Sequence, residues 1–317
     1  MKLPVKKLCC CLLSVVITLV LLLNAFVLNK LYTQSSKTHK EAAHVKGIRV
    51  TENGTVKLNL AGMLLPADGP SNDFYKLPVI NEHKYSYINK PNDPCSNKLL
   101  DLLVAIVSLT MNFDRRRLAR QARETLSSRR IVYLFFLGKS PYMTDLQHRV
   151  DEEAKKYGDI VQEDFVDSER NLSLKSVSIL RWVSDSCSDV KFVIKKDDDI
   201  RLNISSALRS LYFKEKEFRH FVMGNSKYLV EGPIRDEISK YYTSFSEYAE
   251  AFFPLFVHGP AYGFPGRTAL MLYQMSIRTK LFWLEDVYIT GICAHRARIP
   301  VFFDKGFIYT HDSIDAV

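Results

Sequence analysis

Several patterns that would assign a function directly are absent from this sequence. It has no zinc-finger spacing, no basic region followed by heptads and no aromatic RNA-binding signature. We therefore expect no nucleic-acid partner, although the formal net charge is +9. No internal repeat occurs, which excludes a repeat architecture. Cysteine is scarce, with 6 residues among 317, and no pair of cysteines has the spacing of a metal site.

The excess of basic residues fits more than one role. Scattered Lys and Arg favour a membrane surface or an anionic small molecule such as a nucleoside diphosphate, and they also keep a protein soluble. Charge alone does not choose between these roles. The composition, 47% hydrophobic and 25% charged, is that of a globular protein.

The amino-terminal segment predicts a membrane anchor. Residues 8–28 carry no charged side chain and are long enough to cross a bilayer. The lysines before them, Lys2, Lys6 and Lys7, favour a cytoplasmic amino terminus. A cleaved signal peptide is the competing interpretation, but its apolar stretch would be shorter and would end in small residues. We predict a cytoplasmic tail over 1–7, a transmembrane signal-anchor over 8–28 and a lumenal remainder.

Glycosylation signals and cysteines agree with a lumenal chain. Acceptor tripeptides begin at Asn53, Asn171 and Asn203. Three cysteines lie at the membrane edge, where palmitoylation and a purely apolar role are both open. The other three are Cys95, Cys187 and Cys293. Because this number is odd, at most one intramolecular bridge forms and one thiol stays free or pairs between chains.

The remainder divides into a polar stem over 29–84 and one globular domain over 85–317. Within the domain, apolar runs and helical spacing alternate, which predicts a mostly parallel sheet covered by helices. The expected strands are 102–107, 131–137, 160–161 and 191–194, and the expected helices are 144–157 and 172–186.

Asp197, Asp198 and Asp199 directly follow the last of these strands. Adjacent carboxylates repel one another unless a cation holds them. Ligands of such sheets bind at the carboxyl ends of strands. Oxygen ligands there suit Mg²⁺ or Mn²⁺, which could bridge to a diphosphate and neutralise a leaving group. A solvated acidic turn is the alternative.

Glu285 and Asp286 form a second acidic site inside an apolar stretch. Burial there would raise the pKa of a carboxyl group and make it a better general base. The alternative is a pair that caps a helix. Near the end of the chain, His311 is either structural or completes a metal shell begun by the Asp triplet.

These motifs, in this order, resemble the β-1,3-galactosyltransferase family, which includes β-1,3-N-acetylglucosaminyltransferases. The similarity runs from about Cys95 to His311. The segments that carry it are 123–125, 136–139, 159–168, 171–175, 181–183, 197–199, 232–235, 259–262 and 285–293. Chance does not account for so many motifs at the family's spacing. The resemblance implies an α/β, glycosyltransferase-A-like single domain with a mostly parallel central sheet flanked by helices, after the transmembrane helix.

The resemblance also implies a role for each matching residue. Asp197, Asp198 and Asp199 match the Asp-x-Asp motif that binds manganese and the nucleotide-sugar. The implied metal ligands are Asp197, Asp199 and His311. Asp286 matches the catalytic base, and the Gly259–Tyr262 loop faces the sugars. The implied donor-side residues are Asp197, Asp198, Arg123, Asp167 and Lys175.

The implied reaction is an inverting transfer of galactose from UDP-galactose to an acceptor sugar hydroxyl, in β-1,3 linkage, on a protein or lipid glycan. The cofactor would be Mn²⁺ or Mg²⁺. The location would be the Golgi membrane, with one span and a lumenal catalytic domain. Two alternatives stay open: UDP-N-acetylglucosamine as donor, and a non-catalytic sugar-binding or chaperone relative. Non-catalytic relatives tend to lose the Asp triplet, which this chain keeps.

The chain departs from the family pattern at several positions. Val257 replaces a common cysteine, so Cys293 is expected to lack its usual partner. Pro260 interrupts a glycine-rich run, and the segment between Cys293 and His311 is short. The metal and base motifs are intact.

Overall fold

The computed structural model describes residues 48–50, 56–58, 75–95, 100–126, 129–140, 144–226 and 230–312. The predicted tail (1–7) and signal-anchor (8–28) lie outside these residues. No helix in the described part of the chain is long and apolar enough to cross a membrane. Strands β1 (Ile48–Val50) and β2 (Val56–Leu58) pair antiparallel within a first unit, which ends at residue 64.

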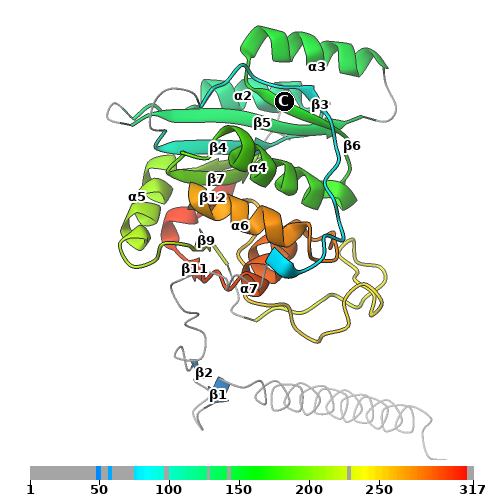
Figure 1. Ribbon diagram of the computed structural model, residues 1–317, viewed down its shortest axis with the longest axis vertical. Coiled ribbons are helices and arrows are strands. Elements are labelled where there is room, and N and C mark those ends of the chain that lie inside the picture. Colours follow the sequence, from blue (N-terminus) through cyan, green and yellow to red (C-terminus); the bar gives the residue numbers. More distant parts are fainter. Residues whose placement is uncertain are drawn as a thin grey trace, which may run out of the picture. The chain divides into compact units, whose positions relative to one another are not determined.

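The second unit, residues 65–317, is built on a sheet of eight strands formed by the described residues (Figure 1). The strand order is β11-β9-β10-β7-β4-β5-β6-β3. Their bounds are β3 (Tyr87–Asn89), β4 (Leu102–Val107), β5 (Ile131–Lys139), β6 (Ile160–Val166), β7 (Phe192–Asp197), β9 (Val222–Gly224), β10 (Ala261–Pro265) and β11 (Val301–Phe303). The central neighbours β7, β4, β5 and β6 all run parallel. The predicted α/β domain with a mostly parallel sheet is confirmed.

Helices cover both faces of this sheet (Figure 1). Alternate residues of β4 enter two different cores: Leu103 packs with α4 (Leu172–Ser186) and α6 (Gly266–Ser276), whereas Val104 packs with α5 (Ile204–Glu215). The helix α3 (Thr144–Tyr157) contributes Val150 to the second core, which α2 (Phe113–Gln121) also contacts. A strand buried on both faces explains the unbroken apolar run in its sequence.

Helix bounds follow the sequence signals closely, and strand bounds follow them less closely. Helix α4 spans the predicted residues, and α3 ends before Gly158, which has a φ of 59°. Strands β5, β6 and β7 each run further toward their carboxyl ends than predicted. A glycine, polar or charged residue follows each predicted end, namely Gly138 in β5, Gln162 in β6 and Lys195 in β7, so hydrophobicity alone ends these strands too early.

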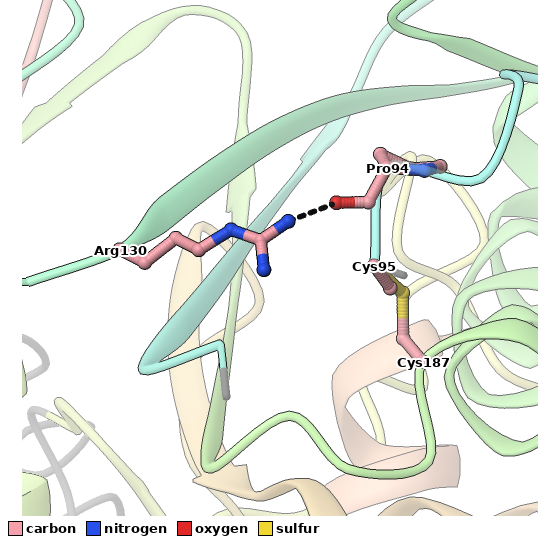
Figure 2. The surroundings of a disulfide bond; sticks show 4 residues. All are labelled: Pro94, Cys95, Arg130 and Cys187. Carbon is pink, nitrogen blue, oxygen red and sulfur yellow. Dashed lines mark hydrogen bonds between the residues drawn. A yellow bond between two sulfur atoms is a disulfide. The ribbon is translucent and has the colours of Figure 1, made fainter. Parts of the chain in front are cut away.

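Cys95 and Cys187 form a disulfide, and Cys293 is buried with a free thiol. The bond joins the chain before β4 to the end of α4, and Arg130 donates a hydrogen bond to the carbonyl of Pro94 beside it (Figure 2). Residues 80–83, which the sequence assigned to the stem, belong to this unit. The backbone N–H of Ile80 donates to the carbonyl of Ile277, and the ring of His83 pairs with Glu163.

We predict that replacing both Cys95 and Cys187 by Ser lowers the free energy of unfolding by about 2–5 kcal/mol. The bridge spans 92 residues, and a cross-link over so long a loop restricts the unfolded chain strongly. Urea denaturation followed by circular dichroism measures the change. Cys293→Ala, which opens no covalent loop, is the control. Equal denaturation midpoints for the double variant and the parent would contradict the prediction.

Candidate active site

The acidic triplet lies at the carboxyl end of a buried strand, as the sequence predicted. Asp197 is the last residue of β7, and its backbone N–H donates to the carbonyl of Pro260 over 3.0 Å. Asp198 and Asp199 form the turn into β8 (Ile200–Leu202). The three carboxylates have different surroundings, which determine what each can do.

The carboxylate of Asp198 is turned into the protein. It is buried and accepts hydrogen bonds from the Ser108 hydroxyl at 2.7 Å and from the Asn112 side-chain amide at 2.9 Å. These donors come from the loop between β4 and α2, so Asp198 ties the turn to the neighbouring strand. Its contacts are those of a residue that positions Asp197 and Asp199.

Asp199 is the most accessible member of the triplet, with 38% of its side chain exposed. Its carboxylate lies 3.4 Å from the guanidinium of Arg115. The carboxylate of Asp197 is held by Lys195 instead, with 2.7 Å between Oδ1 and Nζ.

Lys195 connects the triplet to the second acidic site. Its ammonium group, 1% exposed, lies 2.7 Å from Asp197 and 3.5 Å from Glu285, and donates to the carbonyl of Gly259 at 2.6 Å. Burial alone would lower the pKa of Lys195, but the Asp197 and Glu285 carboxylates hold it above its ordinary value. Sequence reasoning missed this residue. A lysine inside a buried strand is the signal, because buried charges are almost always paired.

Asp286 contacts the Gly259–Tyr262 loop at Gly259, the residue whose carbonyl also binds Lys195. It caps η4 (Val287–Cys293), a π-helix, and accepts hydrogen bonds from the backbone N–H of Val287 at 2.8 Å and of Gly259 at 3.0 Å. Burial raises the pKa of the Asp286 carboxyl group. The capping and general-base interpretations are therefore compatible. Glu285 accepts hydrogen bonds from the hydroxyl groups of Ser176 and Tyr262.

The carboxyl-terminal strand β12 (Tyr309–His311) borders both acidic sites. It pairs antiparallel with β8, which places His311 opposite Ile200, the residue after the triplet. The His311 side chain is exposed. Burial, followed by the nearby Asp197 and Asp286 carboxylates, raises the pKa of Tyr309. The phenol of Tyr309 is thus close enough to both acidic sites to sense their charges.

Two further predicted residues, Asp167 and Lys175, are connected to the triplet through Ser108. They form a buried ion pair 2.8 Å long, and Lys175 also donates to the carbonyl of Ser108 at 2.7 Å. Since the hydroxyl of Ser108 holds Asp198, the pair is connected to the turn that carries the triplet.

Arg123 does not join this group. It pairs with Asp159 and lines a cavity of about 410 Å³ beside the first residues of β5, whereas the triplet lies at the carboxyl ends of the strands. Two arginines of α2 reach the site instead. Arg115 pairs with Asp199. Arg116 is fully buried, binds Glu153 and donates to the Ser108 hydroxyl at 3.1 Å. The sequence motif led to Arg123 because its pattern can be aligned with this arginine-rich segment in more than one way.

The donor groups fit a hard divalent cation. Asp199 presents an accessible carboxylate with one long ion pair, and a carboxylate can accept several further contacts. Carboxylate oxygens and an imidazole nitrogen suit Mn²⁺. Among the described residues, no three His, Cys, Asp or Glu side chains are already gathered around one point. The ligand set Asp197, Asp199 and His311 therefore stays a prediction.

The chain is similar to known glycosyltransferases over most of its length. A family model described as Galactosyltransferase matches residues 114–303, which contain both acidic sites. Beta-1,3-galactosyltransferase 1 of Homo sapiens is 35% identical over 234 residues, covering 72% of this chain and 70% of the relative. The chain belongs to the β-1,3-galactosyltransferase family.

Other members of the β-1,3-galactosyltransferase family match a similar part of the chain. Beta-1,3-galactosyltransferase 2 of Mus musculus is 31% identical over 238 residues, or 73% of this chain and 56% of the relative. Beta-1,3-galactosyltransferase 5 of Gorilla gorilla gorilla is 30% identical over 250 residues, or 75% of this chain and 83% of the relative. Membership of this family makes the chain a glycosyltransferase, whose substrates are a sugar donor and a glycan acceptor.

Proposed function

We propose that this protein is an inverting galactosyltransferase that moves galactose from UDP-galactose to a glycan acceptor on protein or lipid, in β-1,3 linkage and with Mn²⁺. The observation that supports it most directly is Lys195, whose contacts with Asp197 and Gly259 keep the acidic triplet and Asp286 next to one another. We further propose that residues 8–28 anchor the protein in the Golgi membrane, with residues 85–317 in the lumen.

Asp286 is the proposed base. Its carboxylate would take the proton of the acceptor hydroxyl as that oxygen bonds to the anomeric carbon of the donor. The bond from this carbon to the diphosphate breaks on the opposite face, so the configuration inverts and UDP leaves. The backbone N–H groups of Gly259 and Val287 donate to the two carboxylate oxygens of Asp286 and fix their direction. A base held in this way would stay aligned with the acceptor hydroxyl, which favours the reaction.

The triplet is the proposed donor site. Asp197, Asp199 and His311 would hold Mn²⁺ or, in its place, Mg²⁺. When bound, the ion would supply positive charge that stabilises the departing diphosphate. Asp198 would act by fixing the turn through Ser108 and Asn112.

The proposal is tested by measuring UDP release from the full-length protein, purified in detergent, with Mn²⁺, a panel of UDP-sugars and simple acceptor glycosides. We expect turnover with UDP-galactose, and loss of at least about 100-fold in Asp199→Ala, because the ion that neutralises the diphosphate would lose a ligand. Glu217→Ala, an exposed carboxylate paired with Lys214, is the matched control and should keep full activity.

Other results would revise the proposal in distinct ways. Turnover only with UDP-N-acetylglucosamine would replace the donor and keep the enzyme class. A folded protein that neither turns over any UDP-sugar nor binds UDP with Mn²⁺ would point instead to a non-catalytic relative.

A further inference from the structure

Arg115 is the cationic side chain nearest the accessible end of the triplet. It lies in the first turn of α2, and one guanidinium nitrogen is 3.4 Å from both Asp198 and Asp199. Its neighbour Arg116 is different, since it is fully buried and binds both oxygens of Glu153 through its Nε at 3.0 and 3.1 Å. Arg116 is fixed in the fold, whereas Arg115 has 37% of its side chain exposed.

The contacts of Arg115 are easily given up. Asp198 already accepts two shorter hydrogen bonds from Ser108 and Asn112, so it does not depend on the guanidinium. The pair with Asp199 is long and has both side chains more than a third exposed, and such pairs contribute little to stability. Among the described residues, Arg115 is the side chain that forms an ion pair with Asp199.

A metal ion and Arg115 would compete for the same carboxylate. An ion bound to Asp199 would repel the guanidinium, while the diphosphate of a bound nucleotide would place new negative charge nearby. A guanidinium presents its N–H donors in a planar fork that matches phosphate oxygens, and its long side chain can change partner without moving the helix.

We propose that Arg115 is a displaceable counter-ion, which neutralises Asp199 in the empty site and moves to the nucleotide diphosphate when the metal binds. This inference rests on the proposed metal-dependent donor site. It assigns Arg115 two opposite effects: it weakens the binding of the metal alone, and it strengthens the binding of the nucleotide once the metal is present.

The test is a pair of binding measurements on full-length protein in detergent. Electron paramagnetic resonance follows free Mn²⁺ to give the affinity for the metal alone, and calorimetry gives the affinity for UDP at saturating Mn²⁺. For Arg115→Ala we expect Mn²⁺ to bind about 2–5-fold more tightly, since a weak exposed ion pair is removed. We expect UDP to bind about 10-fold more weakly, since a charge-assisted contact is lost.

Matched variants separate this role from a structural one. Arg117→Ala lies on the same helix, is 56% exposed and pairs with Asp114, so it should change neither affinity. Arg115→Lys keeps the charge and should restore the weaker Mn²⁺ binding, with UDP affinity between those of Arg115→Ala and the parent.

The outcomes distinguish failure of this inference from failure of the proposed function. If Arg115→Ala leaves Mn²⁺ binding unchanged, or shifts both affinities in the same direction, Arg115 is not a displaceable counter-ion, and the donor site stands. If the parent binds no Mn²⁺ with or without UDP, the metal-dependent donor site fails, and this inference fails with it.

Discussion

Asp286→Asn should lower kcat by about 10²–10⁴-fold while UDP binding with Mn²⁺ stays within about 3-fold of the parent. The carboxamide cannot take the proton of the acceptor hydroxyl, but the hydrogen bonds that Asp286 accepts come from Gly259 and Val287 and not from the triplet that donor binding requires. Steady-state kinetics and calorimetry of UDP measure the two effects. Parallel loss of both would mean that Asp286 shapes the donor site and is not the base.

The substitution also changes a cap, so it needs a structural control. Asn keeps one acceptor oxygen, whereas Asp286 uses both of its oxygens to accept backbone N–H groups. Asp304 caps η5 (Lys305–Phe307) in a similar way, by accepting from the backbone N–H of Gly306 at 2.7 Å. Asp304→Asn should cost a comparable free energy of unfolding, about 0.5–2 kcal/mol, without the loss of kcat.

The pH dependence of the parent provides a second check on the same residue. Burial raises the pKa of Asp286 above the ordinary value of 3.8. Because the base acts in its ionised form, kcat/KM should fall as the pH drops through this raised pKa, and Asp286→Asn should lose that acidic limb. The free energy of unfolding should change in the opposite direction to kcat/KM. Because the folded state binds this proton more tightly than the unfolded state, ionised Asp286 lowers the free energy of unfolding above its folded pKa, and this loss disappears as the pH falls.

Helices α3 and α4 and the central strands were predictable because their patterns are local, whereas α2, α5 and α6 were not predicted. Strand β4 and helix α4 have the bounds that their apolar runs predicted, and the position of the Asp triplet after a buried strand was clear from the same run. The connection of the triplet to Asp286 was not predictable. It passes through Lys195 and Gly259, which are 64 residues apart, and no periodicity encodes such a contact.

Arg123 illustrates the limit of motif matching. Five arginines, Arg115, Arg116, Arg117, Arg120 and Arg123, fall in one amphipathic region, and a one-dimensional pattern can be aligned with them in more than one register. Helix geometry decides between these registers, because α2 turns Arg116 toward Ser108, leaves Arg115 at the triplet and places Arg123 against Asp159 beyond the helix end.

Lys195→Met should destabilise the fold and abolish turnover together. The substitution keeps most of the volume of the side chain but leaves Glu285 and Asp197 without their shared cation, and removal of one partner from a buried ion pair costs about 3–5 kcal/mol. The pKa of Lys195 is raised above 10.5, so its stabilising charge is fully present at neutral pH and is lost only as the pH rises through the raised value. Urea denaturation at pH 7 measures the cost.

Two variants show whether the cost comes from the lost charge pairing. Lys196→Met removes an adjacent buried lysine that forms no ion pair with a described residue and whose pKa is lowered by burial, so it should cost much less. Adding Glu285→Gln to Lys195→Met removes the carboxylate left unpaired, and should recover about 0.5–3 kcal/mol as a coupling energy. Additive effects of the two substitutions would show that the pair between Lys195 and Glu285 contributes nothing to stability. In the double variant we expect a positive coupling energy but still no turnover, because Asp197 and Gly259 have lost the Lys195 ammonium group that donates to both. That combination would identify Lys195 as the residue that positions both acidic sites.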